Sequence, residues 1–298
     1  MINWFTDQID RMHWQCFDRL ILCLLTGFSM IRCDENPFGE SVVIAPQNRL
    51  IQGQLLLSDG ESPAGIYVWL ERIDISTRTD SGGNFQLVLP PFRPLGPVEN
   101  QSGQFRLFFY VANYRMTSVD VTILKGQFIP SRGDLDAEGN VMGTRSLRKL
   151  LDIHTTINPA TVNLNNNQFI GICVSLTALF DSVVVRFPKI MGASSGALIF
   201  RHVRSGDLFV EIPDSPSAGE DVVKIGQDGY QWMMGYNFEV GALPEGEYEV
   251  IPYFLIEQEG LPDGLLDSIH PDATELGPAY LKIPFRRSGG RFHVETDM

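Results

Sequence analysis

The sequence is poor in cysteine, and most of its cysteines are gathered near its beginning. It has 298 residues and four cysteines, which are Cys16, Cys23, Cys33 and Cys173. The first three lie in or just after the N-terminal apolar segment, and only Cys173 is left for the folded body, which can therefore form neither a disulfide framework nor a metal site of paired cysteines. Cys173 stands in an apolar run, and we expect an inert, buried thiol there.

Positive charge is also scarce. The chain has 23 Lys and Arg against 36 Asp and Glu, which gives a formal net charge of −13. Because contacts to nucleic-acid phosphates need a basic surface, this charge argues against a nucleic-acid partner. It also disfavours docking on an anionic membrane surface through protein charge alone.

Long apolar runs are missing except at residues 20–31. This run of about a dozen residues matches a signal-peptide core of ~7–15 residues and is short for a bilayer-spanning helix of ~20. Arg11 and Arg19 precede it. We therefore expect residues 1–33 to be a leader that exports the chain.

Cys33 follows the apolar run directly and precedes a short polar tether, residues 34–40. This arrangement resembles a bacterial lipoprotein processing site, although Arg32 stands where such sites have a small residue. The resemblance implies a lipid anchor on Cys33. Simple signal cleavage, an uncleaved anchor and a true start at Met12 remain alternatives. All of them predict an exported chain, in the bacterial outer membrane, the periplasm or at the cell surface.

The usual sequence signatures of catalysis and of cofactor binding are absent. There is no glycine-rich phosphate-binding loop, and no pair among His154, His202, His270 and His293 has metal-ligand spacing. The string closest to a nucleophile turn, residues 192–196, is not followed by a predicted helix. We expect no cofactor, no metal and no enzymatic activity. An enzyme with an unrecognised carboxylate site remains an alternative.

Short apolar runs separated by Gly, Pro, Asp and Ser clusters fill the chain instead. This pattern predicts successive β-strands joined by tight turns. We expect an all-β protein with two tandem antiparallel β-sandwich domains. The expected divisions are a first sandwich at residues 41–128, a linker at 129–160 and a second sandwich at 161–298.

The first of these sandwiches carries a recognisable turn, Thr79-Asp80-Ser81-Gly82-Gly83-Asn84-Phe85. With the neighbouring strands it resembles the carboxypeptidase regulatory-like domain, a transthyretin-like or prealbumin-like β-sandwich. The resemblance implies an accessory, non-catalytic module outside the cytoplasm, with Phe85 in its core. In the second half, the turn leading from Leu243-Pro244 to Tyr248 is frequent in immunoglobulin-like and prealbumin-like sandwiches.

An acidic stretch in the expected linker resembles the start of a calcium loop. Asp134, Asp136 and Glu138 alternate there, but Arg145 stands where a bidentate Glu should close the loop. We therefore favour a solvated turn.

Aromatic residues supply the candidate binding residues. If Ile66, Val68 and Leu70 face the core, Tyr67 and Trp69 face outward, where they could stack on sugars or anchor a protein. Tyr230 and Trp232 offer a similar pair in the second sandwich. The alternative is that these rings pack between the domains or under a loop.

The sequence thus predicts a non-catalytic cell-envelope protein with a binding or assembly role. We expect its partner to be an envelope or extracellular protein, and membrane attachment only through Cys33. A carbohydrate-binding accessory module that uses exposed aromatic residues is the alternative.

Overall fold

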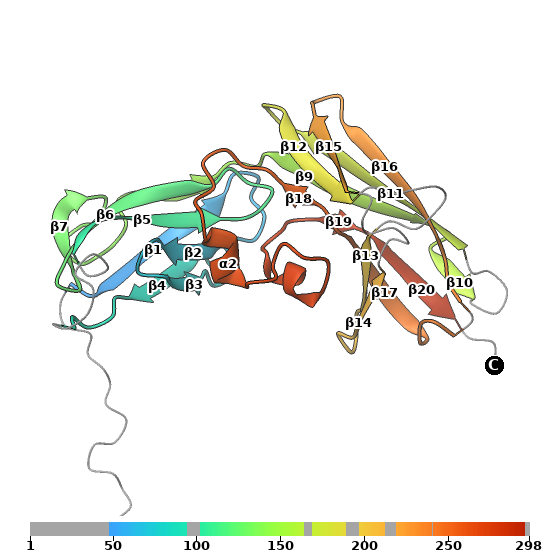
Figure 1. Cartoon of the computed structure of the whole chain (residues 1–298), viewed down its shortest axis with the longest axis horizontal. Coiled ribbons are helices and arrows are strands. Elements are labelled where there is room, and N and C mark those ends of the chain that lie inside the picture. Colours follow the sequence, from blue (N-terminus) through green and yellow to red (C-terminus); the bar gives the residue numbers. More distant parts are fainter. Residues whose placement is uncertain are drawn as a thin grey trace, which may run out of the picture. The chain divides into compact units, whose positions relative to one another are not determined.

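A computed structural model describes residues 48–93, 102–163, 169–188, 197–211, 219–239 and 241–295 (Figure 1). The chain divides into two units, Met1–Ile44 and Ala45–Met298, and every described residue belongs to the second. The predicted leader, the tether, Cys33 and residues 192–196 lie outside the described residues. None of the helices in the described part is long and apolar enough to cross a membrane.

The all-β prediction is confirmed. Among the described residues, the regular elements other than strands are one short α-helix and one short 3-10 helix, α2 (Leu265–Ile269) and η3 (Pro278–Lys282). The strands form two β-sandwiches, one N-terminal and one C-terminal, and most strand pairs are antiparallel.

The first sandwich consists of a three-stranded and a five-stranded sheet. The three-stranded sheet has the order β4 (Asn84–Val88), β1 (Leu50–Leu57), β8 (Arg145–Leu147). The five-stranded sheet has the order β3 (Ile75–Arg78), β2 (Tyr67–Leu70), β5 (Gly103–Tyr110), β6 (Thr117–Leu124), β7 (Gln127–Gly133). Alternate residues of both sheets meet in one core, and Phe85 belongs to it as predicted.

The second sandwich consists of three sheets. The first has the order β16 (Tyr230–Asn237), β11 (Phe169–Ala178), β9 (Leu151–Asn158), β19 (Ser288–Gly289). The next has the order β10 (Thr161–Asn163), β20 (Arg291–Glu295), β17 (Gly246–Pro252), β13 (Leu198–His202), β14 (Leu208–Glu211). The third has the order β15 (Glu220–Ile225), β12 (Val183–Pro188), β18 (Leu255–Ile256).

The prediction of a linker at residues 129–160 is wrong. This segment contains the end of β7, all of β8 and all of β9. Leu135 and Leu147 belong to the core of the first sandwich, and Leu151 belongs to that of the second. The segment thus contributes strands and core residues to both sandwiches and is not a spacer between domains.

Cys173 also differs from its predicted state. Its neighbours Ile172 and Val174 are buried in the core of the second sandwich. Because side chains alternate along a strand, Cys173 points to the outer face of β11, where it is a half-buried free thiol.

The turn before β17 has the expected form. The Tyr248 hydroxyl donates a hydrogen bond of 2.8 Å to the carbonyl of Pro244. Tyr248 is fully buried and enters the core of the second sandwich. The bond ties the turn to the strand that follows it.

Candidate functional site

Tyr67 and Trp69 leave the sandwich core as predicted but do not reach solvent. Ile66, Val68 and Leu70 lie in the core, so the two aromatic rings lie on the other side of β2. Both are only 4% exposed. The prediction that they form an exposed binding pair is therefore wrong, and the alternative, packing under a loop, is confirmed.

The covering loop is the segment of residues 257–287, which we call the cover segment. Its residues Leu265, Tyr280 and Ile283 share one buried cluster with Tyr67 and Trp69. The Tyr67 hydroxyl lies 2.9 Å from that of Ser268 in the same segment.

Trp69 is further fixed by its own sandwich. Its indole Nε1 donates a hydrogen bond of 2.9 Å to Asp74, and its ring lies 5.9 Å from that of Phe108 on β5. The polar atom of the indole therefore has its partner within the protein, as a buried Trp requires.

Tyr230 and Trp232 do not form an exposed pair either. Both stand on the core-facing side of β16, because strand alternation puts Trp232, Met234 and Tyr236 into the core. Trp232 is 7% exposed, and its ring centre lies 4.6 Å from that of Phe187. Tyr230, at the start of the strand, is 36% exposed and also lies against Phe187.

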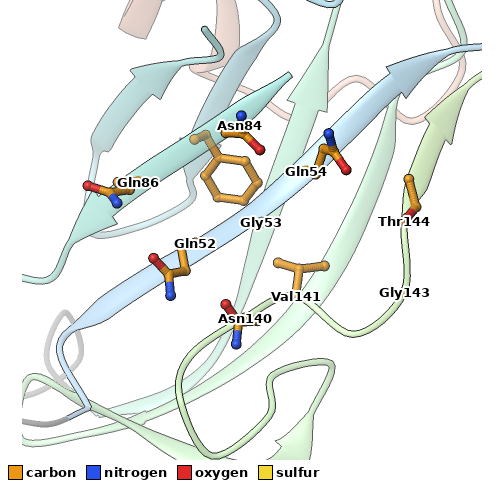
Figure 2. Close-up of a pocket in the computed structure, with 10 residues that line it drawn as sticks. Gln52, Gly53, Gln54, Asn84, Gln86, Asn140, Val141, Gly143 and Thr144 are labelled. Carbon is orange, nitrogen blue, oxygen red and sulfur yellow. The ribbon is translucent and has the colours of Figure 1, made fainter. Parts of the chain in front are cut away.

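An open, hydrogen-bonding surface lies instead on the outer face of the three-stranded sheet of the first sandwich (Figure 2). The register places Gln52 opposite Gln86, and Gln54 opposite Asn84. A groove of about 590 Å³ runs there, which we call the amide groove. Its lining residues are Gln52, Gly53, Gln54, Asn84, Phe85, Gln86, Asn140, Val141, Gly143 and Thr144.

Two turns with the same sequence pattern supply the two Asn residues of the groove. The pattern Asp-x-x-Gly-Asn occurs at residues 80–84 and again at 136–140. In the first turn the Asp80 carboxylate accepts the backbone N–H groups of Gly82 and Asn84, at 2.9 and 2.8 Å. In the second, Asp136 accepts those of Glu138 and Asn140, at 3.0 and 2.7 Å. The chain therefore uses one local structure twice.

Each turn docks on β1 through its glycine. The Gly83 carbonyl accepts the Leu55 N–H at 2.9 Å, and the Gly139 carbonyl accepts the Gln52 N–H at 2.9 Å. Both glycines have positive φ, +80° and +85°, and a Cβ on either would lie 2.1 Å from a carbonyl oxygen of β1. Only glycine fits at these positions, because the backbone of β1 comes too close for a side chain.

Gly53 in the middle of β1 has a similar role. A Cβ there would lie 3.0 Å from the ring of Phe85, its partner on β4, and 3.1 Å from Val141. Without a side chain, β1 lets the Phe85 ring pack against its backbone. The Phe85 ring therefore packs closely against β1 from the core side of the sheet.

No residue that lines the amide groove carries a charge. The nearby turn carboxylates are held ionised by their own turns. Hydrogen bonds from Asn84, first through its backbone N–H and then through its side chain, lower the pKa of Asp80. The side chain of Asn140, followed by its backbone N–H, lowers the pKa of Asp136.

The acidic stretch around Asp136 forms a turn of this kind. Asp134 pairs with Arg145 at 3.3 Å, and Asp136 is bound to N–H groups of its own turn. Within the described residues, no group of three or more His, Cys, Asp or Glu side chains could hold a metal ion.

Sequence reasoning missed the amide groove, although signals for it were present. Gln52 and Gln54 alternate with core residues on β1, and Gln86 does the same on β4. The repeated Asp-x-x-Gly-Asn pattern was the second signal. The register of β1 against β4 was needed to bring these residues together.

These features define a class of protein, an all-β chain of two sandwiches with an uncharged groove on the outer face of the first. No family model matches the chain, and no curated protein matches it. The resemblance to the carboxypeptidase regulatory-like domain therefore stays a prediction.

Among solved structures, the chain is similar to three bacterial pilins. The major pilin subunit BcpA of Bacillus cereus is 11% identical, with a TM-score of 0.26, over 70% of this chain and 66% of that one. The major pilin SpaD of Corynebacterium diphtheriae is 9% identical, with a TM-score of 0.33, over 72% and 64%. A streptococcal ancillary pilin is 14% identical, with a TM-score of 0.23, over 72% and 60%. The chain spans less than two thirds of these structures, and at such TM-scores they carry no argument about its function.

Proposed function

We propose that this chain is a non-catalytic cell-envelope protein that binds a neutral, hydroxyl-rich ligand, such as a glycan chain, in the amide groove. The observation that carries the proposal is the lining of the groove, in which five of the ten residues are carboxamides: Gln52, Gln54, Asn84, Gln86 and Asn140. A carboxamide has both donors and acceptors of hydrogen bonds. The NH₂ groups of Gln54, Asn84 and Asn140 already donate to Gly82, Asp80 and Asp136, so these three offer mainly their carbonyl oxygens to a ligand. A sugar hydroxyl both donates and accepts hydrogen bonds, so the two surfaces are chemically matched.

The absence of charge in the lining narrows the ligand class. Phosphate and carboxylate ligands are recognised by Arg or Lys, and neither lines the groove. The volume of about 590 Å³ falls in the range of ligand sites, ~300–1,000 Å³. Such sites are mostly apolar, whereas this one is polar and lies on an open sheet face, which favours a hydrated ligand.

The envelope location rests on the predicted leader and on Cys33. The proposal is that the sandwiches stand outside the cytoplasm, attached through lipid on Cys33. Mass spectrometry of the mature N-terminus tests this step, because an unmodified Cys33 in the mature protein contradicts the anchor. Binding and anchoring are independent, so the loss of one leaves the other in place.

The binding step is tested on an array that contains neutral and acidic oligosaccharides. We expect binding to neutral oligosaccharides only, and loss of this binding in the double variant Gln52→Ala, Gln86→Ala. The matched control is Gln127→Ala, which removes an exposed strand glutamine on β7, outside the groove. The proposal is wrong if no neutral glycan binds, or if both variants bind as the wild type does.

A further inference from the structure

β16 is an edge strand of unusual composition. It pairs with β11 along its whole length on one side, and no described strand pairs with its other side. Its eight residues read Tyr-Gln-Trp-Met-Met-Gly-Tyr-Asn, without a charged residue or a proline. An edge of this kind presents unpaired N–H and C=O groups to which another strand can bind.

Most of the other edge strands of the described sheets have features that discourage such binding. Some carry a charge or a proline, such as Arg78 on β3, Pro130 and Arg132 on β7, Arg145 on β8, Glu211 on β14, and Glu220, Asp221 and Lys224 on β15. Of the others, β10, β18 and β19 are short, with three, two and two residues, and β4 has five. Natural sheets use charge, proline and short length to protect edges. β16, with eight residues, is the longest of these edge strands and carries neither charge nor proline.

The direction of the free backbone groups of β16 follows from the neighbouring strands. Leu179 donates to the carbonyl of Leu150 at 3.0 Å, which continues the β11–β9 register. In an antiparallel ladder, residues alternate between the two sides, so odd-numbered residues of β11 bond to β9 and even-numbered ones to β16. The N–H of the even-numbered Ala178 donates to the Gly226 carbonyl at 3.1 Å and so points away from β9, as this alternation requires.

The same alternation applies to β16. Its even-numbered residues bond to β11, since the register pairs Trp232 with Val174 and Met234 with Ile172. Gln231, Met233 and Gly235 therefore direct their N–H and C=O groups to the open edge.

The side chains at this edge do not block a second strand from pairing with β16. Gln231 and Met233 are exposed, and Met233 is 73% exposed, the highest value among the large hydrophobic residues of the described chain. Gly235 has no side chain. An exposed Met on an edge strand is an apolar contact that a second copy would partly bury.

We propose that two copies of this chain associate through β16, in antiparallel pairing about a two-fold axis that passes beside Met233. This register puts Gln231 of each copy opposite Gly235 of the other. The groups that point to the open edge then face one another, and about six backbone hydrogen bonds form, two for each of three residue pairs. In this register, the core-facing residues of both copies lie on the same face of the joined sheet.

A second copy is the occupant because β16 matches itself: the strand carries no charge and pairs with its own copy in antiparallel register. Each copy carries a net charge of −13, so two copies repel one another over most of their surfaces. A contact between them must use an uncharged surface on both, and β16 provides the same uncharged strand twice. An isologous contact of this kind closes on itself and gives a dimer, not a fibre.

Sedimentation velocity from low to high micromolar concentration tests the proposal. We expect a monomer–dimer equilibrium for the wild type. Met233→Lys and, separately, Gln231→Lys place a charge at the open edge and are expected to weaken association at least about tenfold. The matched control Leu124→Lys changes a residue that is 53% exposed on β6, adds the same charge and is expected to associate as the wild type does.

Amide hydrogen exchange, followed by nuclear magnetic resonance, locates the contact without any substitution. The N–H groups of Gln231, Met233 and Gly235 should exchange quickly in dilute samples and slowly in concentrated ones. Those of Trp232 and Met234 should be protected in both, because they bond to β11. The proposal is overturned if the wild type stays monomeric at high concentration, if both Lys variants dimerise as tightly as the wild type, or if the three edge amides exchange equally at both concentrations.

Discussion

The two outer faces of the first sandwich differ in chemistry, and this difference explains why only one of them is open. On β2 and β5, the residues that point away from the core include four aromatic ones, Tyr67, Trp69, Phe108 and Tyr110. On β1 and β4, they include Gln52, Gln54 and Gln86. A buried aromatic side chain removes ~150–250 Å² from water, at about 25 cal/mol per Å². The aromatic face is therefore covered, while the amide face stays hydrated and available.

The cover of the aromatic face is held by directional bonds as well as by packing. Ala112 donates to the Pro284 carbonyl at 2.8 Å, and Asn113 exchanges hydrogen bonds with the Arg286 backbone at 2.9 and 3.0 Å. The side chain of Gln258 donates to the Ala112 carbonyl at 2.7 Å. The cover segment is therefore hydrogen-bonded at several points to Ala112 and Asn113, which follow β5.

The largest effect is expected on the covered face. Trp69→Ala removes a ring that is 4% exposed and leaves Asp74 without its indole partner. We expect the free energy of unfolding to fall by about 3–5 kcal/mol, as for other large-to-small changes in a core. Urea unfolding measures this fall. A loss below about 1 kcal/mol would mean that the cover segment does not pack on Trp69.

The next effect concerns the two turns beside the open face. Gly83→Ala and Gly139→Ala each place a Cβ 2.1 Å from a carbonyl oxygen of β1. We expect each to lower the free energy of unfolding by about 2–4 kcal/mol, because a turn must move off β1. Gly60→Ala is the control, since Gly60 also has positive φ, +75°, but nothing lies within 4 Å of its Cβ position. An equal loss in all three variants would mean that backbone strain alone, and not docking on β1, restricts the turns.

A third test concerns a cluster of charged residues, in which one buried lysine contacts three carboxylates. Lys149 Nζ lies 3.0 Å from Asp59, 3.2 Å from Glu61 and 3.0 Å from Asp152 on β9. Burial by itself would lower the pKa of Lys149, but hydrogen bonds to Asp152, Asp59 and Glu61 outweigh it and raise the pKa. Burial by itself would raise the pKa of Asp59, but hydrogen bonds from Tyr114 and Lys149 outweigh it and lower the pKa below 3.8.

The signs of these shifts set the pH window of the cluster. The lowered pKa of Asp59 stabilises the fold above 3.8, and this stability is lost as the pH falls through the folded value. The raised pKa of Lys149 stabilises it below 10.5, and this is lost as the pH rises through the folded value. Lys149→Met should cost about 2–3 kcal/mol at neutral pH, since three carboxylates lose their cation. Unfolding measured at pH 3 should show a smaller cost, and an equal cost at both pH values would contradict the ionic account.

The smallest effect on stability is expected on the open face. Gln52→Ala with Gln86→Ala should change the free energy of unfolding by no more than about 0.5 kcal/mol, because both side chains are on the surface. The same variant is predicted to lose glycan binding. A large loss of stability in thermal unfolding would mean that the amides support the fold and are not available to a ligand.

Much of the fold could be predicted from the sequence because its information is local. The alternation of Ile66, Val68 and Leu70, the turn at Asp80 and the bond from Tyr248 each depend on nearby residues. What covers Trp69 could not be predicted, since Tyr67 meets Ser268 across 201 residues. The amide groove was missed for a related reason, because Asn140 reaches it from a segment that reads as a linker.

The central claim, that the amide groove is the binding site, is tested most directly by the side-chain NH₂ resonances of its glutamines in nuclear magnetic resonance spectra. With a neutral oligosaccharide selected on the array, the resonances of Gln52, Gln54 and Gln86 should shift together and saturate, while those of Gln104 and Gln127 stay unchanged. Binding that leaves the three groove glutamines unmoved, or that shifts all five alike, would contradict the account.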